Sequence, residues 1–163
     1  MQVMNIADHV RFALNYDPLT GVFVWKNHKR RPDLVGHRAG SPTNTGYWAI
    51  AIFNQKRLAH RLAWLWMTGE WPINHIDHID GNKQNNSFAN LREVSRFGNL
   101  QNMRLPTKAN KSGFLGVSAH QGKWRVQIMA HGKLIRESGF NTPEIAHQRY
   151  LQLKRLHHGT CTI

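Results

Sequence analysis

The chain has 163 residues, with 22 Lys and Arg against nine Asp and Glu, and a formal charge of +13. Apolar residues make up 40%, including six Trp and seven Phe, which is enough for a core and excludes wholesale disorder. A charge of this size predicts a polyanionic partner. Nucleic acid is the first candidate and an anionic membrane surface the second, and a basic protein without such a partner is the alternative.

Cysteine use and hydropathy point to a reducing, aqueous compartment. Cys161 is the only cysteine, so an intrachain disulfide and a cysteine-rich zinc site are excluded. The opening MQVMNIADHVRF lacks the basic head and apolar run of a signal peptide. The longest apolar run, LAWLWM (62–67), is too short to cross a bilayer. We therefore expect a cytoplasmic protein.

The first part of the chain predicts a small sheet with helices. Asn5 is a candidate N-cap for a helix over 5–14, and YDPLTG (16–21) is a turn. Strands are expected at 21–26 and 47–53, separated by a basic loop and followed by NQKR as a tight connection. Residues 58–69 have the period of an amphipathic helix, which Gly69 closes.

The middle segment predicts two strands and one helix. Strands are expected at 75–79 and 90–94, joined by a polar loop over 80–89. Ser95 is a candidate N-cap for the helix that follows. Residues 105–112 are polar and basic without periodicity, which indicates a linker. The first domain is therefore expected over 1–104, with its core at about 71–104.

The last part, 113–163, predicts a second domain of three antiparallel strands and one helix. The strands are expected at 114–120, 123–129 and 133–140, with QG and AHG turns between them. Thr142 is the candidate N-cap of the helix, with Pro143 in its first turn. The fold class expected for the whole chain is α+β.

The segment NHIDHIDGNKQNN (74–86) carries the residues best suited to chemistry. Hydrolysis of a phosphodiester needs an activated water and neutralisation of charge at the phosphate, which a neutral histidine and a divalent metal can supply. Asp77 and His78 are adjacent, and Asn90 and Asn99 follow. The side chain of Asn90 is expected either to bind backbone across the loop or to fix the His78 ring. Asp80 is interpreted as a turn residue.

Residues 77–102, DHIDGNKQNNSFANLREVSRFGNLQN, resemble the HNH endonucleases, whose core is a two-stranded ribbon, one helix and one metal. The resemblance extends to the phage homing branch over roughly 15–104, through YDPLTGVFVWK and AHRLAWLWMTGEWP. It implies His78 as general base, Asp77 and Asn99 as ligands of one Mg²⁺ or Mn²⁺, and Asn90 as a catalytic-site residue that holds the ribbon. Asn99 stands where the family often has histidine, and amide oxygen disfavours softer ions. The candidate supporting residues are His75, His60 and Asn102.

Residues 112–150 resemble the AP2 DNA-binding domain, through Gly116–Val117, Gly122–Lys123–Trp124, Phe140–x–Thr142 and Glu144–x–Ala146. The resemblance implies that the sheet enters the major groove. Strand alternation places Trp124, Val126 and Ile128 on the helix side and the polar residues on the other. The candidate DNA-binding residues are Lys123, Arg125, Gln127, Arg136, Ser118 and His120, with Lys29, Arg30 and Arg31 in the basic loop.

The resemblances imply a nuclease that cuts double-stranded DNA as a monomer, leaving 5′-phosphate and 3′-hydroxyl ends. They also imply a phage protein in a bacterial host cell, with no membrane association. A single core per chain predicts a nick as its simplest product. Two alternatives stay open: a DNA-binding regulator that carries a degenerate core, and an RNA nuclease.

Overall fold

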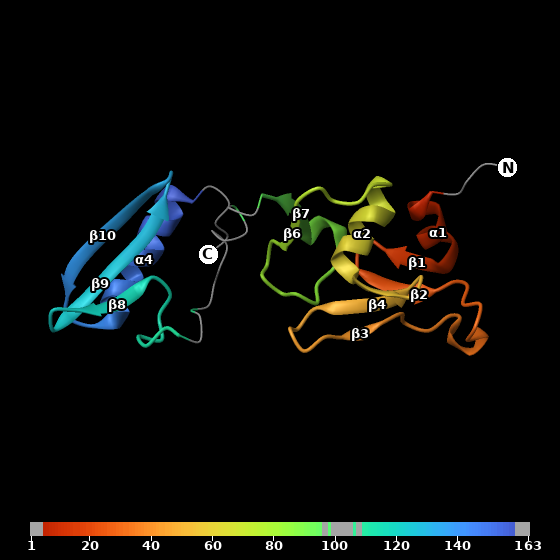
Figure 1. Ribbon diagram of the computed structural model, residues 1–163, viewed down its shortest axis with the longest axis horizontal. Coiled ribbons are helices and arrows are strands. Elements are labelled where there is room, and N and C mark those ends of the chain that lie inside the picture. The colour runs from red at the N-terminus through yellow and green to blue at the C-terminus, as the bar shows by residue number, and fades with distance from the viewer. Residues whose placement is uncertain (1–4, 96–97, 99–105, 107–108, 159–163) are drawn as a thin grey trace. The chain divides into compact units, whose positions relative to one another are not determined.

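The structure of the protein, a computed structural model, describes residues 5–95, 98, 106 and 109–158. The chain divides into two units, Met1–Ser95 and Arg96–Ile163, and each unit has its own hydrophobic core (Figure 1). Within the described residues, small antiparallel sheets and three helices confirm the expected mixed class. None of the helices described is long and apolar enough to cross a membrane.

The first unit begins with α1 (Ile6–Ala13), where the side chain of Asn5 accepts a hydrogen bond from the backbone N–H of Asp8 at 2.9 Å. The expected end of this helix at residue 14 is wrong, because Leu14 already begins strand β1 (Leu14–Asp17). β1 pairs antiparallel with β2 (Val22–Trp25). Leu14 and Tyr16 alternate with exposed residues and enter the core, which makes a strand more favourable than another helical turn.

A second sheet follows, in the order β3 (Ser41–Pro42), β4 (Trp48–Ile52) and β5 (Gln55–Leu58). The basic loop before it contains the short 3₁₀ helix η1 (Pro32–Leu34). The sequence interpretation of NQKR as only a tight connection is wrong, because residues 55–57 pair with β4 as an exposed edge strand. Helix α2 (Ala59–Thr68) then ends at Gly69, whose φ of 85° is left-handed as expected of a C-terminal cap.

The third sheet is a two-stranded ribbon of β6 (His75–His78) and β7 (Leu91–Val94), with the short 3₁₀ helix η2 (Phe88–Asn90) before β7. It lies at the end of the first unit, in green in Figure 1. Ile76 and Leu91 of the ribbon join the core formed by α1, β1, β2, β4 and α2. The helix expected after Ser95 falls almost entirely outside the described residues.

The second unit is a three-stranded sheet in the order β10 (Lys133–Phe140), β9 (Lys123–Ala130) and β8 (Val117–His120). Helix α4 (Pro143–His157) covers one face of this sheet. Val126 and Ile128 of β9 are buried against Ala146, Tyr150 and Leu153 of the helix, which agrees with the expected apolar row. The first strand begins at Val117 and not at 114.

Gly21, between β1 and β2, lets the first hairpin touch the 80–89 loop. Its φ is +72°, and a Cβ there would overlap the backbone of Asn86 and Ser87. The Tyr16 hydroxyl donates to the backbone oxygen of Asn86 at 2.7 Å, and the N–H of Phe88 donates to the backbone oxygen of Pro18 at 2.9 Å. The hairpin therefore fixes the position of this loop.

Gly36 provides a matched control, because its φ is also left-handed, at +84°, but a Cβ would meet nothing within 4 Å. Both Gly21→Ala and Gly36→Ala add the same backbone strain, about 1 kcal/mol. We expect Gly36→Ala to lose only this amount and Gly21→Ala to lose about 3 kcal/mol or more, because the loop must also move. Urea unfolding followed by Trp fluorescence measures both, and equal losses would contradict the close packing.

Candidate nuclease site

Asp77 and His78 lie at the end of β6, where the ribbon meets its loop. Asp77 faces Arg92 and His78 faces Leu91 in the register with β7, and the N–H of Ile79 donates to the backbone oxygen of Asn90 at 2.9 Å. Consecutive strand residues alternate in direction, and here His78 is buried while Asp77 is half-buried. The negative charge of Asp77 nevertheless acts on His78: it favours the protonated ring and so raises the pKa of His78.

The orientation of the His78 ring is set by Asn86. The ring nitrogen Nε2 lies 3.2 Å from Oδ1 of Asn86, and the side chain is 6% exposed. An amide oxygen only accepts hydrogen bonds, so this contact places the ring proton on Nε2. Nδ1 is then the nitrogen that can take up a proton.

Burial is the main influence on the charge of His78. It lowers the pKa of the ring, and Lys83 lowers it further, while the bond to Asn86 and the charges of Asp80 and Asp77 oppose the effect. The net result is a pKa below the ordinary value of 6.5. His78 is therefore neutral at pH 7, which is the form that a general base requires.

His60 of α2 lies directly beside His78. The two ring centroids are 5.0 Å apart in an edge-to-face arrangement, and the ring of Tyr47 packs at a tilt against His60, with its centroid 5.2 Å away. His60 is 5% exposed, and among the described residues its Nδ1 has no hydrogen-bond partner. Burial above all lowers its pKa to about 3, and the charge of Arg61 and that of His78 in its protonated form add to the effect. A second neutral ring thus packs against the first.

The loop between the strands is held by a network centred on Asp80. Its Oδ1 accepts from the N–H of Asn82 at 2.8 Å and from Nδ2 of Asn90 at 3.0 Å, and its Oδ2 accepts from Asn85 at 2.7 Å. Burial raises the pKa of Asp80, but these hydrogen bonds, led by that from Asn85, outweigh it and hold the pKa low. These contacts agree with the interpretation of Asp80 as a turn residue.

Asn90 takes the first of its two expected arrangements. Its Oδ1 accepts from the N–H of Asp80 at 2.9 Å, and its Nδ2 donates to the backbone oxygen of Asn85 at 2.8 Å. Asn90 therefore fixes the loop that carries Asn86, and it acts on His78 through that loop.

Across the ribbon, Arg92 contacts Asp77. Its Nη2 and Nε donate to Oδ2 of Asp77 at 2.9 and 3.1 Å, and the two side chains are 26% and 14% exposed. The described part of the chain has no group of three or more His, Cys, Asp and Glu that could hold a metal. Of the ligands that the resemblance implies, Asp77 is described, and Asn99 lies outside the described residues, as does Asn102.

The other candidates are distributed over the surface. His75 lies at the exposed start of β6, opposite Val94. Lys29 and Arg30 are exposed in the basic loop, whereas Arg31 is paired with Asp33 at 2.7 Å.

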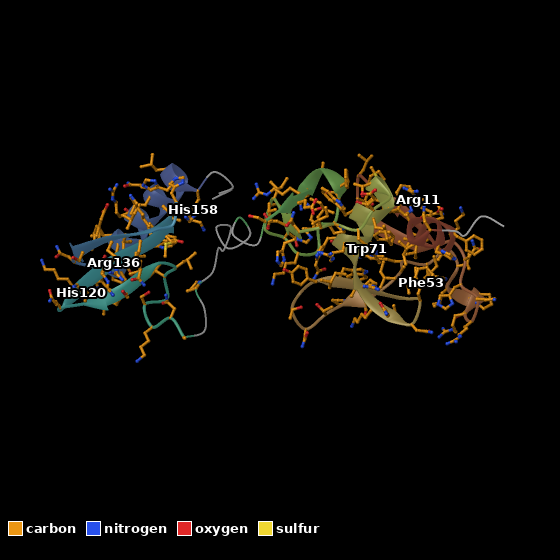
Figure 2. The ribbon with its side chains drawn as sticks, turned by 45° about the horizontal axis from the view of Figure 1, so that its top comes forward. Arg11, Phe53, Trp71, His120, Arg136 and His158 are labelled. Atoms are coloured by element: carbon orange, nitrogen blue, oxygen red, sulfur yellow. The ribbon has the colours of Figure 1, made fainter. Side chains whose placement is uncertain are left out.

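Sequence reasoning gave no role to a basic groove on the first unit, lined by Lys56, Arg57, Leu58, Arg61 and Trp71. The guanidinium of Arg57 lies 5.2 Å from the ring centroid of Trp71, which is labelled in Figure 2. Arg61 donates to the backbone oxygens of Pro72 and Asn74, each at 3.1 Å. None of the described residues that line the groove is acidic, so the charge of this lining is positive throughout.

In the second unit, the strand register brings the candidate DNA-binding side chains together on one face. Gln127 lies opposite Arg136, Arg125 lies between Ser118 and Ser138, and Lys123 lies opposite His120. Nη2 of Arg125 is 3.4 Å from the hydroxyl of Ser118. This face is opposite to the one that α4 covers, and Arg136 and His120 are labelled on it in Figure 2.

Sequence reasoning also gave no role to Asn86, Arg92 and Tyr47. The signals were present as the Asn-Asn pair of the loop and the Arg of Asn-Leu-Arg. Their contacts depend on the register of the ribbon and the packing of its loop, which local spacing does not report.

The depressed pKa of His60 predicts an acid-sensitive first unit. As pH falls below 6.5, the unfolded chain binds a proton at His60, whereas the folded chain does not until about pH 3. Stability is therefore complete above the unfolded pKa and falls with acidification, by about 2 kcal/mol at pH 5. Urea unfolding at pH 7.5 and pH 5, followed by Trp fluorescence, should show this loss in the unchanged protein. His60→Phe should lose about 2 kcal/mol less, and an equal loss in both proteins would contradict the prediction.

Comparison with known proteins identifies the middle of the chain. Residues 57–109 match the model of a family described as HNH endonuclease, and this stretch contains α2, the ribbon and its loop. Protein 3.8 of Escherichia phage T7 is 39% identical over 74 residues, which are 42% of this chain and 60% of that protein. The chain thus spans less than two thirds of this curated relative. No solved structure matches the chain. Residues 57–109 are therefore similar to the HNH endonuclease family, and part of the chain is similar to a phage protein.

Proposed function

We propose that the protein is a metal-dependent endonuclease that hydrolyses phosphodiester bonds of double-stranded DNA. The observation that carries this proposal is His78, a buried and neutral histidine at the end of β6 with its proton fixed on Nε2. It lies within the stretch that matches the HNH model. A positioned neutral imidazole can activate water, and the charge of +13 attracts the substrate.

In this mechanism His78 accepts a proton from water at Nδ1, and the resulting hydroxide attacks phosphorus in line with the leaving O3′. Asn86 keeps the ring in the required tautomer, and Asp80 and Asn90 hold the loop that carries Asn86. Asp77 and Asn99 would hold one Mg²⁺ or Mn²⁺, because carboxylate and amide oxygens suit a hard divalent cation. When bound, the metal neutralises charge on the phosphate and the leaving oxygen.

The first unit would hold the DNA backbone through its basic surfaces. The groove lined by Lys56, Arg57 and Arg61 supports this role, because three cations without an acid would release counterions when they meet phosphates. Lys29 and Arg30 of the exposed loop would add to the same attraction. Arg31 would contribute less, since Asp33 already neutralises it.

The second unit would act as an AP2-like DNA-binding domain whose uncovered sheet face meets the major groove. Arg125 and Gln127 can contact guanine and adenine edges, and Lys123 a phosphate. Their support is the register that aligns them with Ser118, His120 and Arg136. A tether between the modules would raise affinity through effective concentration, so a monomer could bind DNA and nick one strand.

Supercoiled plasmid with Mg²⁺ or Mn²⁺ tests the nuclease proposal. We expect conversion to open circles that stops on chelation and is about 10²–10⁴-fold slower in His78→Ala, because the base is lost. His9→Ala is the matched control, since it removes an exposed histidine of α1 in the same unit, and it should cut normally. If the protein binds plasmids of several sequences but cuts none of them with either metal, the DNA-binding regulator is favoured and the nuclease proposal is overturned.

The two faces of β10 test the role of the second unit. Arg136 lies on the uncovered face, whereas Lys133 lies on the alternate side of the same strand, and both are exposed. Arg136→Gln and Lys133→Gln each remove one charge. Only Arg136→Gln should weaken binding to a 30-bp duplex strongly, and the slope of log K against log salt should fall by about 0.9. Equal effects would mean that only net charge matters and that the face has no special role.

A further inference from the structure

The contact between Arg92 and Asp77 places a fixed positive charge beside the carboxylate that the proposed function assigns to the metal. Two N–H groups of one guanidinium bond to the same carboxylate oxygen, at 2.9 and 3.1 Å. The two residues are direct cross-strand neighbours in the ribbon. Because the backbone holds the two residues opposite each other, Arg92 stays close to any ligand of Asp77 even when either side chain rotates.

We propose that Arg92 is the resident counterion of Asp77, and that it couples metal binding to DNA binding. In the free protein Arg92 neutralises the carboxylate and opposes the approach of a divalent cation. When a phosphate group of DNA arrives, the guanidinium can transfer one or both of its donors to phosphate oxygens, which it matches in geometry. The carboxylate then becomes available to the metal, and the phosphate adds an oxygen ligand of its own. This inference rests on the proposed function.

Two effects of Arg92 on metal affinity oppose each other, and their sizes decide the sign. Arg92 orders the Asp77 side chain before the metal arrives. Metal binding then loses less conformational entropy, by the amount associated with one or two side-chain torsions. Arg92 also repels the cation, and this effect is larger, because the repulsion energy of a divalent ion is twice that of a monovalent one and the pair is only 26% and 14% exposed. Removal of the charge should therefore tighten metal binding in the absence of DNA.

The first measurement is Mn²⁺ binding to the free protein, followed by the electron paramagnetic resonance signal of unbound Mn²⁺. We expect Arg92→Gln to bind Mn²⁺ at least about tenfold more tightly than the unchanged protein. Arg92→Lys retains the charge and should stay within about threefold of it. Arg92→Met is a second neutral variant that keeps an aliphatic stem, in case the Gln variant folds poorly by circular dichroism. Arg38→Gln removes a charge beside Trp48 and should change nothing.

The second measurement adds an uncut 30-bp duplex in a His78→Ala background. In the His78→Ala protein that retains Arg92, DNA should tighten Mn²⁺ binding at least about tenfold. Linkage then requires that Mn²⁺ tighten DNA binding by the same factor. In Arg92→Gln this coupling should shrink to a few-fold, because the counterion is already absent.

The outcomes separate the inference from the proposed function. If Arg92→Gln and Arg92→Met bind Mn²⁺ no more tightly than the unchanged protein, or the coupling to DNA is as large without Arg92, the counterion role is overturned. Asp77→Asn tests the site itself: it should weaken Mn²⁺ binding in the Arg92→Gln background. If Asp77→Asn has no effect there, Asp77 is not a metal ligand, and the metal site of the proposed function fails together with the inference.

Discussion

The hydrogen bond between His78 and Asn86 is the contact on which the rest of the site depends. It fixes the tautomer of the ring, and it requires that Asn86 be held in one place. Asn86 is 1% exposed, and its backbone is held by Tyr16, 70 positions earlier in the chain, and by the close approach of Gly21. Burial raises the pKa of Tyr16 far above its ordinary value, so its hydroxyl stays protonated and remains a donor. The first hairpin is thus structural support for the site.

The same burial explains how a strongly basic protein can keep a neutral base. Desolvation is the main cause that lowers the pKa of both His60 and His78. Arg61 adds to it at His60 and Lys83 at His78, where the charges of Asp80 and Asp77 oppose it. Against this background the few acidic residues are committed locally. Asp17 caps a turn through Leu19 and Thr20, Glu93 accepts from the N–H of Asn74, and Glu137 pairs with Arg149. Acids used in this way shape the chain and leave its exposed surface positive.

The sequence predicted what depends on local spacing. The ribbon follows from two short segments on either side of a polar loop that begins with an Asp-Gly-Asn turn, and the strands of the second unit from period-two runs bounded by Gly turns. Three strands of the first unit were not predicted: β1, β3 and β5. β3 has only two residues, Ser41–Pro42, and lies where the sequence analysis expects the basic loop. β1 directly follows a helix whose apolar period runs into Leu14, and β5 is an exposed edge whose Gln55, Lys56 and Arg57 have the composition of a turn.

The same limit explains which parts of the site sequence alone could assign. His78, Asp77 and Asn90 stand at a recognisable spacing, so their chemistry could be proposed without a fold. The contacts of Asn86 and Arg92 could not be deduced in the same way, because one requires the hairpin to pack on the loop and the other requires the exact register of β6 with β7. A shift of one residue in that register would take Arg92 from the side of Asp77 and place Leu91 or Glu93 there instead. The register of the ribbon therefore decides whether the carboxylate faces a cation, an apolar side chain or a second acid, and with it how strongly the site attracts a metal before DNA is present.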